Sequence, residues 1–378
     1  MNMHLEPLPE ARLKQAKWAY TTRRINQDRH FQLLSGTVIP EAGDLVLARV
    51  EELGRHKRLE LVSSRRATMF EGDEIVVVYG NRYAPDQFEG IVPDHLGRCR
   101  LVAAGGVAAR LLNRHDKIRS ATRIKPLGLL TDAEGQRINL ISSRLPKVDQ
   151  LEPGPLVLVV AGTSMNSGKT TTCANLVKGF IRQKIKVAAA KFTGTGAGAD
   201  YRSLVDAGAD PVFDFIDAGY VSTYHAHRDV LHDIVMTLGA QMAAAEPDII
   251  IVEVADGLLQ RETARLFATP AFTDWIDGII FAANDALGAQ AGISWLSARQ
   301  LPVFAITGVL TSSPLARREA EDICGLPVYH TGALARPSVS SYIYRCLEFR
   351  RRNRMTLSLI HISEPTRQLM SSRMPSSA

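Results

Sequence analysis

Hydrophobic positions along the chain follow two different patterns, and the change falls near residue 150. In the first half, short β-branched runs recur about every ten residues and are separated by turn residues, which predicts a small β-barrel or sandwich over residues 1–145. Helices are expected at Pro9–Tyr20 and at Leu101–Arg114, although Gly105 and Gly106 weaken the second. The expected strands are Asp44–Val50, Arg58–Val62, Glu74–Tyr79 and Gln87–Val92.

The second half alternates continuous apolar runs with longer amphipathic ones. This alternation predicts an α/β domain over residues 156–356, with a mostly parallel sheet covered by helices on both faces. Residues 146–155, rich in Pro and Gly, are expected to be the linker. The expected strands are Leu156–Gly162, Lys186–Ala190, Pro211–Ile216, Asp248–Val254, Gly278–Ala282, Pro302–Thr307 and Leu326–Tyr329, and the expected helices are Cys173–Lys184, Arg228–Ala245, Leu287–Arg299 and Pro314–Cys324.

The clearest motif lies between the first of these strands and its helix, in the sequence LVLVVAGTSMNSGKTTT. A strand, a glycine-bounded loop and a helix in this order form the context of a phosphate-binding loop, in which backbone N–H groups and the helix N-terminus surround phosphate oxygens. Lys169 is expected to reach the terminal phosphates and Thr170 to ligate Mg²⁺. Five residues, one more than in the common loop, separate Gly162 from Gly168. The expected nucleotide contacts are Gly162, Thr163, Asn166, Ser167, Gly168, Lys169, Thr170 and Thr171.

Ligands of open parallel sheets bind beyond the carboxyl ends of the strands, so the loops after the other strands are the next place to look. Lys191 follows the second strand and is expected to face the phosphates from the side opposite Lys169. Asp200 and Glu253 are candidate Mg²⁺ ligands, because an acidic group at such a strand end usually holds nucleotide-bound Mg²⁺. Asp256 is a candidate for orienting a substrate amine or hydroxyl. The segment Asp214–His227 is expected to shape the substrate pocket.

Composition and charge restrict the function classes further. Residues 1–150 carry 24 Lys and Arg against 18 Asp and Glu, whereas the rest of the chain is balanced, so the net charge of +6 lies in the first half. Asn81-Arg82-Tyr83, beside a strand, and the basic run Arg110–Lys125 are candidate contacts for a phosphate or a nucleic acid. No aromatic residues are interleaved with the basic residues as stacking platforms, which argues against a nucleic-acid partner. The sequence has no apolar run of about 20 residues and no apolar N-terminal leader, so we expect a cytoplasmic protein without a membrane partner. Four scattered cysteines predict reduced thiols.

Four segments together resemble the dethiobiotin synthetase and cobyrinic acid amide synthase group of P-loop NTPases. They are GTSMNSGKTTT, KFTGTG, VEVADGLLQ and FAANDALGAQAGISWL, and the resemblance covers about residues 156–332. It implies ATP or GTP with Mg²⁺ as cofactors, nucleotide contacts by Lys169 and Thr170, and substrate and phosphate contacts by Lys191. It also implies metal binding by Asp200 and Glu253. Relatives of this fold often place the site at a dimer interface, so a homodimer is possible.

Two departures from that group leave the reaction open. Asp256 stands where the group has a small residue beside the substrate, and Thr307-Gly308-Val309 replaces the asparagine that usually reads adenine. The first hypothesis is an ATP-dependent enzyme that activates or phosphorylates a small carboxylate or carbamate substrate. The second is an ATP- or GTP-dependent accessory or switch protein whose N-terminal domain binds a partner or cofactor. The third, an RNA- or DNA-binding ATPase, rests only on the basic first half.

Residues 357–378 are excluded from this interpretation. The segment LSLIHISEPTR resembles the in-frame translation of a transposon-end sequencing adapter, and the residues after it fit the same source. We therefore expect no function in this tail, and we expect the natural sequence to end or diverge near Thr356.

Overall fold

The computed structural model describes residues 3–353, and its N-terminal half is built from β-strands. The predicted strands are present as β4, β5, β7 and β8, whereas only Glu10–Gln15 of the expected first helix is helical. The strands are β1 (Met3–Pro7), β2 (Lys17–Trp18), β3 (Gln32–Gly36), β4 (Leu45–Glu52), β5 (Arg58–Glu60), β6 (Arg66–Thr68), β7 (Glu74–Tyr79), β8 (Phe88–Ile91), β9 (Cys99–Ala103), β10 (Val107–Arg114) and β11 (Thr122–Thr131), with α1 (Glu10–Gln15) and the short 3₁₀ helices η1 (Tyr20–Thr22) and η2 (Leu140–Ser143).

Five of these strands close into a barrel. Their pairings run β11–β4, β4–β7, β7–β10, β10–β9 and back from β9 to β11. Alternate side chains of the strands fill the interior, among them Val46, Ile75, Val77, Leu101 and Ile124. Closure removes free strand edges within the ring, which is how small antiparallel folds avoid edge-to-edge association. Of the two predicted alternatives, barrel and sandwich, the structure therefore has the barrel.

The helix expected at Leu101–Arg114 is wrong. These residues end β9 and form β10, which pair antiparallel around a tight turn at Ala104–Gly106. Gly106 has a φ of +104° in that turn, and the Cβ of another residue there would lie 2.1 Å from the Cβ of Ala19. The two glycines therefore mark a hairpin turn and not a weak point in a helix.

The second half contains the predicted parallel sheet, with strand order β14-β13-β15-β12-β16-β17. All five neighbouring pairs are parallel. The expected strand at Leu326–Tyr329 is reduced to one isolated parallel bridge between Ile306 and Val328. The strands are β12 (Leu156–Gly162), β13 (Val187–Lys191), β14 (Val212–Asp214), β15 (Ile249–Glu253), β16 (Gly278–Ala282) and β17 (Val303–Thr307).

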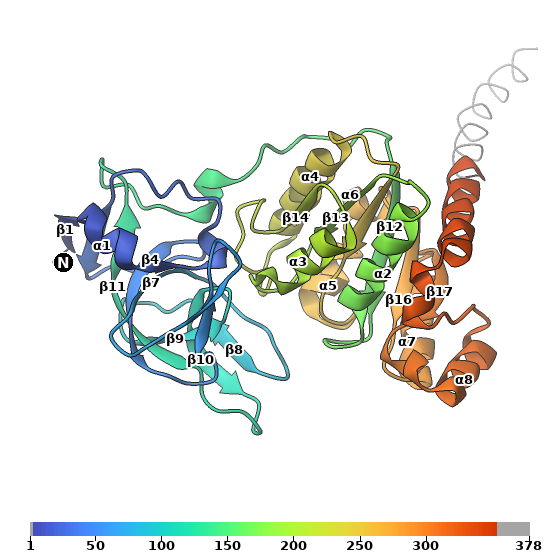
Figure 1. Cartoon of the computed structure of the whole chain (residues 1–378), viewed down its shortest axis with the longest axis horizontal. Coiled ribbons are helices and arrows are strands. Elements are labelled where there is room, and N and C mark those ends of the chain that lie inside the picture. The colour runs from blue at the N-terminus through green and yellow to red at the C-terminus, as the bar shows by residue number, and fades with distance from the viewer. Residues whose placement is uncertain (1–2, 354–378) are drawn as a thin grey trace, which may run out of the picture.

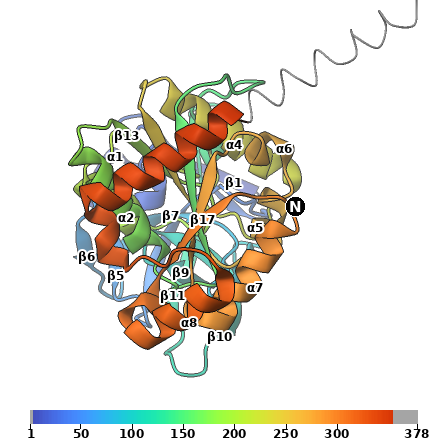
Figure 2. The ribbon, with the colours of Figure 1, turned by 90° about the vertical axis from the view of Figure 1, so that its right-hand side faces the viewer.

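Helices cover both faces of this sheet. Successive residues of β12 enter opposite cores: Val157 and Val159 lie in one cluster, and Leu158 and Val160 lie in the other. Residues 337–353 are helical and pass beside α2 (Figure 2). The Tyr344 ring of this segment contacts Phe180 of α2. Within residues 3–353 no helix is long and apolar enough to span a membrane, and the predicted adapter segment 357–378 lies outside these residues. The helices are α2 (Lys169–Ile181), α3 (Gly198–Ala207), α4 (Arg228–Ala243), α5 (Arg261–Leu266), α6 (Pro270–Thr273), α7 (Ala286–Ser297) and α8 (Pro314–Cys324), with 3₁₀ helices η3 (Val309–Ser312) and η4 (Thr331–Ala335).

The barrel and the parallel sheet lie side by side, and the segment between β11 and β12 runs along their common edge (Figure 1). Their contact includes backbone as well as side chains. A Cβ added to Gly105 of the barrel hairpin would lie 2.3 Å from the carbonyl oxygen of Gly196, in the loop after β13. Hydrophobic residues of both halves, such as Val107 and Val221, belong to one continuous core cluster. The two halves therefore pack as one body.

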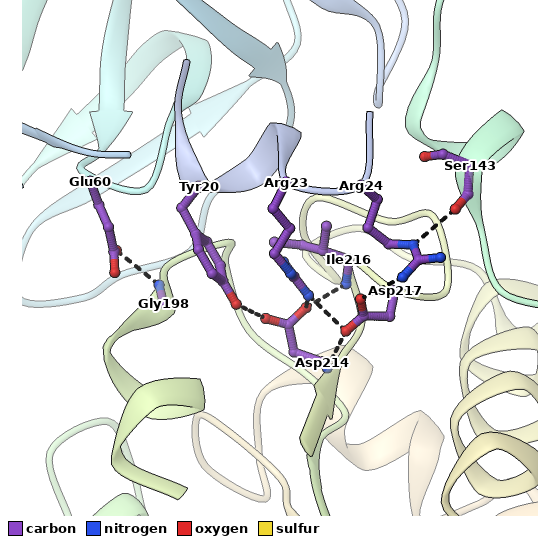
Figure 3. Close-up of polar contacts among 9 residues, drawn as sticks. All are labelled: Tyr20, Arg23, Arg24, Glu60, Ser143, Gly198, Asp214, Ile216 and Asp217. Atoms are coloured by element: carbon purple, nitrogen blue, oxygen red, sulfur yellow. Dashed lines mark hydrogen bonds and ion pairs between the residues drawn. The ribbon is translucent and has the colours of Figure 1, made fainter. Parts of the chain in front are cut away.

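A buried charge cluster holds this contact together (Figure 3). Arg23 Nη2 donates to Asp214 Oδ1 (2.8 Å) and to Asp217 Oδ2 (2.7 Å), and the Tyr20 hydroxyl donates to Asp214 Oδ2 (2.6 Å). The Arg23 guanidinium also lies 4.5 Å from the centroid of the Tyr20 ring. The sequence predicts that the segment containing Asp217 shapes a substrate pocket. In the structure Asp217 instead contacts the barrel half. Likewise, the Tyr224 hydroxyl donates to Glu89 of β8 (2.8 Å).

Replacing Arg23 by alanine should destabilise the protein strongly, because it leaves two buried carboxylates without their cation. Loss of one partner from a buried ion pair costs about 3–5 kcal/mol. Arg24 is the matched control, since its side chain is 29% exposed and its Nη1 lies 3.5 Å from Asp217; Arg24→Ala should cost about 1 kcal/mol or less. Urea denaturation of the full chain measures both. Equal midpoints for the two variants would contradict the structural role given to Arg23.

Candidate functional site

The loop between β12 and α2 has the geometry that phosphate binding requires. Gly168 precedes the first residue of α2 with a φ of +96°, and its ideal Cβ would lie 3.2 Å from the Cα of Gly308. At the other end, a Cβ on Gly162 would lie 2.4 Å from the Ser167 hydroxyl. Both positions therefore need glycine. Lys169 begins the helix, and its Nζ donates to the carbonyl oxygen of Ser164 (2.7 Å), which holds the amine over the loop.

Strand register brings the other predicted residues to the same edge. Lys191 and Glu253 are Cα partners on β13 and β15, and Glu253 is also opposite Val160 of β12. The Lys191 amine is paired with Asp200 on α3. Thr170 Oγ1 contacts both Glu253 Oε1 (2.9 Å) and Asp200 Oδ1 (3.1 Å). Four predicted residues from three strand ends thus form one connected polar cluster.

Glu253 is the most perturbed acid in this cluster. Burial, together with repulsion from Asp200, raises its pKa to about 7. Its Oε1 accepts from Thr170, whereas its buried Oε2 has no hydrogen-bond partner among the described residues. An unpaired buried carboxylate oxygen is costly, and a cation beside it removes that cost.

These oxygen donors fit Mg²⁺. The Thr170 hydroxyl and the carboxylates of Asp200 and Glu253 are hard ligands, and Glu253 has one oxygen to spare. Over residues 3–353 no group of three or more His, Cys, Asp or Glu side chains is placed to hold a metal ion by itself. Nucleotide-bound Mg²⁺ usually takes only one or two carboxylates, and phosphate and water supply its other ligands. Thr170, Asp200 and Glu253 are therefore the residues that would hold it.

Asp256 lies in a strained turn beside the phosphate loop. Its φ is +62°, and burial raises the pKa of its carboxyl group. The next residue, Gly257, packs against the phosphate loop so closely that a Cβ there would lie 2.1 Å from the carbonyl oxygen of Thr163. This contact fixes Asp256 near Lys169 and Lys191, both of which lower its pKa electrostatically. Strained non-glycine residues of this kind cluster at functional sites.

All of these loops open into one cavity of 610 Å³, within the range of small-molecule sites. Of the predicted residues, Asn166, Gly168, Lys169, Thr170, Thr171, Lys191, Asp200, Glu253 and Asp256 line it. Gly162, Thr163 and Ser167 do not line it and instead shape the loop from behind. Ser167 is fully buried, and its carbonyl oxygen accepts from Val309 N–H (3.1 Å).

The barrel supplies the rest of the cavity wall, most of which the sequence does not predict. The lining side chains from the barrel half include His56, Arg82, Tyr83 and Gln87. Burial lowers the pKa of His56 to about 4, so it is neutral at physiological pH. Barrel and phosphate loop also touch directly, since Asn166 Nδ2 donates to Asp86 Oδ2 (3.1 Å). The sequence marks only Arg82 and Tyr83 among them, in the segment Asn81-Arg82-Tyr83, whereas His56 and Gln87 reach the site only through the packing of the two halves.

A second barrel residue positions the acidic cluster. Glu60 Oε2 accepts a hydrogen bond from Gly198 N–H (2.9 Å), the first residue of α3, whose own N-cap residue Ala197 provides no side-chain cap (Figure 3). A carboxylate at a helix N-terminus is stabilised by the unpaired N–H groups and by the helix dipole. Because Asp200 lies in the first turn of the same helix, Glu60 fixes the position of a candidate metal ligand.

Comparisons with known proteins find only distant structural similarity. No protein-family model matches the chain, and no curated protein does. The 54 kDa signal recognition particle protein of Aeropyrum pernix K1, solved with GDP, is similar at TM-score 0.35 and 20% identity over 58% of this chain and 54% of its own. FtsY of Elizabethkingia anophelis is similar at TM-score 0.32 and 18% identity, over 49% of this chain and 56% of its own. Chloroplast FtsY of Physcomitrella patens is similar at TM-score 0.33 and 17% identity, over 55% of this chain and 70% of its own. This chain thus spans about half the length of the first two of these proteins.

The strand order and the loop therefore identify the fold without help from these comparisons. The chain has a P-loop NTPase fold with an added β-barrel. The weak structural likeness gives no support to a dethiobiotin synthetase-like specificity, and it does not decide between ATP and GTP.

Replacing Glu60 by alanine should weaken Mg²⁺-nucleotide binding although Glu60 itself does not line the cavity. Loss of a cap costs roughly 1 kcal/mol and lets the first turn of α3 and Asp200 shift. Glu60→Gln keeps an acceptor oxygen and should recover most of the affinity. Glu71→Ala, at an exposed turn of the same barrel, is the control. Calorimetric titration of each variant with Mg²⁺-nucleotide measures the effect, and equal affinity for Glu60→Ala and Glu71→Ala would refute it.

Proposed function

We propose that this protein is a Mg²⁺-nucleotide-dependent P-loop enzyme that transfers a phosphoryl group to a small carboxylate or carbamate substrate. The observation that supports it best is the 610 Å³ cavity, in which two buried lysines, Lys169 and Lys191, lie beside three acidic groups at the end of a phosphate loop. A cavity of this volume suits a small acceptor.

In this proposal the triphosphate lies along the loop between Gly162 and Thr171. The N–H groups at the start of α2 and the Lys169 amine would bind its oxygens. The loop after β17 is the nearest candidate for contacts with the base, because Gly308 and Val309 pack on Gly168 and Ser167. It carries no side chain that decides between adenine and guanine.

Phosphoryl transfer would then rest on position and charge. An oxygen of the acceptor carboxylate attacks the γ-phosphorus, the bond to the β–γ bridging oxygen breaks, and the nucleoside diphosphate leaves with that electron pair. A carboxylate needs no base for this step, since it has no proton to lose. Lys169 and Lys191 neutralise charge on the transferred group, which is the main protein contribution to such reactions. Mg²⁺ held by Thr170, Asp200 and Glu253 would neutralise further negative charge on the phosphates.

One contact favours a second candidate, a nucleotide-dependent switch. Asn166 in the phosphate loop has a φ of +63° and bonds to Asp86 of the barrel, so a change in this loop on nucleotide binding reaches the barrel directly. A switch would turn over nucleotide slowly and respond to a protein partner. The enzyme would turn it over in proportion to a small cosubstrate. Steady-state hydrolysis with and without a panel of small carboxylates and carbamates separates the two.

Saturating Mg²⁺-nucleotide should raise the melting temperature of the full chain. At a free concentration of 100 times Kd, binding adds about 2.7 kcal/mol to the free energy of unfolding. A thermal-shift screen of ATP, GTP and their non-hydrolysable analogues would show which base is bound. Lys169→Ala should lose most of the shift, whereas Lys178→Ala, an exposed lysine on the same helix, should keep it. A wild-type protein that no Mg²⁺-nucleotide stabilises would contradict the proposal.

A further inference from the structure

We infer that the β-barrel forms the acceptor side of the site, and that Arg82 binds an anionic group of the second substrate. The inference rests on the proposed function and extends it, since it assigns one anionic group of the acceptor to a named residue outside the P-loop fold. The ligand is a small molecule with two groups: one that receives the phosphoryl group, and a separate carboxylate that binds Arg82.

Arg82 is a buried arginine with hydrogen-bonding capacity to spare. Only 6% of the residue is exposed, and it lines the 610 Å³ cavity. Its Nη2 donates to Gln87 Oε1 (2.9 Å) and its Nη1 to the carbonyl oxygen of Val102. The buried Nε has no hydrogen-bond partner among the described residues. Guanidinium groups bind carboxylates through two parallel N–H donors, and Arg82 has more N–H groups than its two hydrogen-bond partners occupy.

The charge of Arg82 has no counter-ion at contact distance. Burial lowers its pKa to about 10, so the side chain is still charged at neutral pH. No carboxylate of residues 3–353 forms an ion pair with it; Asp86 and Asp256 act on it only from a greater distance. Buried charges in folded proteins are usually paired, because an unpaired one costs several kcal/mol.

Arg23 provides the contrast within the same chain. Its side chain is 11% exposed, and it lies between Asp214 and Asp217 at 2.8 and 2.7 Å and serves the domain contact. Arg82 has only an amide oxygen and a backbone carbonyl oxygen as partners, and it borders the cavity instead of a packed interface. A purely structural role leaves the charge of Arg82 without a counter-ion, whereas an anionic ligand would supply one.

The position of Arg82 relative to the phosphate loop fits an acceptor site. Arg82, Asp256, Lys169 and Lys191 line the same cavity, with Arg82 on the barrel side and the lysines at the phosphate loop and at the end of β13. An acceptor anchored at Arg82 would therefore extend across the cavity toward the lysines. Small side chains leave room for it on the barrel side, namely Ala84, Ala103 and Ala104.

Succinate is a suitable probe, titrated calorimetrically into the full chain with saturating Mg²⁺ and a β,γ-imido nucleotide. The nucleotide occupies the phosphate loop, so the remaining anion site is tested alone. Arg82→Gln should weaken succinate binding about tenfold or more, which is the loss of one charged hydrogen bond, and should leave nucleotide affinity unchanged. Arg82→Lys should lie in between. Arg110→Gln removes an exposed charge from the same barrel and should behave like the wild type.

Equal succinate affinity in wild type and Arg82→Gln, or no binding to the wild type, would overturn the inference. If Arg82→Gln does not fold, a crystal structure of the wild type with succinate decides instead: a carboxylate on Arg82 supports the assignment, and succinate bound only elsewhere refutes it. Failure of the wild type to bind any Mg²⁺-nucleotide would contradict the proposed function separately. The Arg82 site would then be tested by titrating succinate, without nucleotide, into two proteins: the Lys169→Ala variant and the Lys169→Ala, Arg82→Gln double variant.

Discussion

The buried charge cluster around Arg23 is the contact on which the site depends. Asp214 ends β14 and is the register partner of Lys191 on β13, so the strand ends that hold the barrel are the neighbours of those that carry the chemistry. Fixing the barrel at Asp214 therefore also fixes it over the carboxyl edge of the sheet, where parallel α/β folds bind ligands. The hydrogen bond from Gly198 to Glu60 extends the same contact to α3 and to Asp200.

Closure of that edge changes the electrostatics of the site. Lys169, Lys191 and Arg82 line one cavity with Asp200, Glu253 and Asp256, and all of these residues except Asp200 are buried. Interactions between charges are stronger in such surroundings than in water. The Lys191–Asp200 pair compensates one acid and one base, whereas the raised pKa of Glu253 reflects burial and repulsion from Asp200. A triphosphate carries more negative charge than one Mg²⁺ neutralises, so the lysines would have to exchange their present partners for phosphate oxygens. The charges of the cluster are thus only partly compensated by one another, and phosphate with Mg²⁺ would complete the compensation.

The sequence predicts the parallel sheet well and the barrel contribution poorly, for a physical reason. Continuous apolar runs such as Gly278–Ala282 are buried on both faces whatever their neighbours, and the glycine-bounded loop has one geometry, so local patterns suffice there. The hairpin at Leu101–Arg114 was mistaken for a helix because Ala and Leu favour helices locally, while barrel pairing decides the outcome. The sequence marks Arg82 only as a candidate contact for a phosphate or a nucleic acid, and it does not mark Glu60. Their roles come from the packing of the two halves, as in the hydrogen bond between Glu60 and Gly198, which are 138 residues apart.

Rigid packing of the barrel also has a consequence for selectivity. A Cβ added to Gly105 would lie 2.3 Å from the carbonyl oxygen of Gly196, and one added to Gly80 would lie 2.4 Å from Val221 Cγ1, so the two halves are closely packed at both positions. The separation between Arg82 and the phosphate loop is then set by backbone contacts and not by mobile side chains. On the proposed assignment of Arg82, an acceptor would reach the γ-phosphate only if its length matched that separation, because a misplacement of about 1 Å already costs much of the rate. The packing that closes the site would then also select the length of the acceptor.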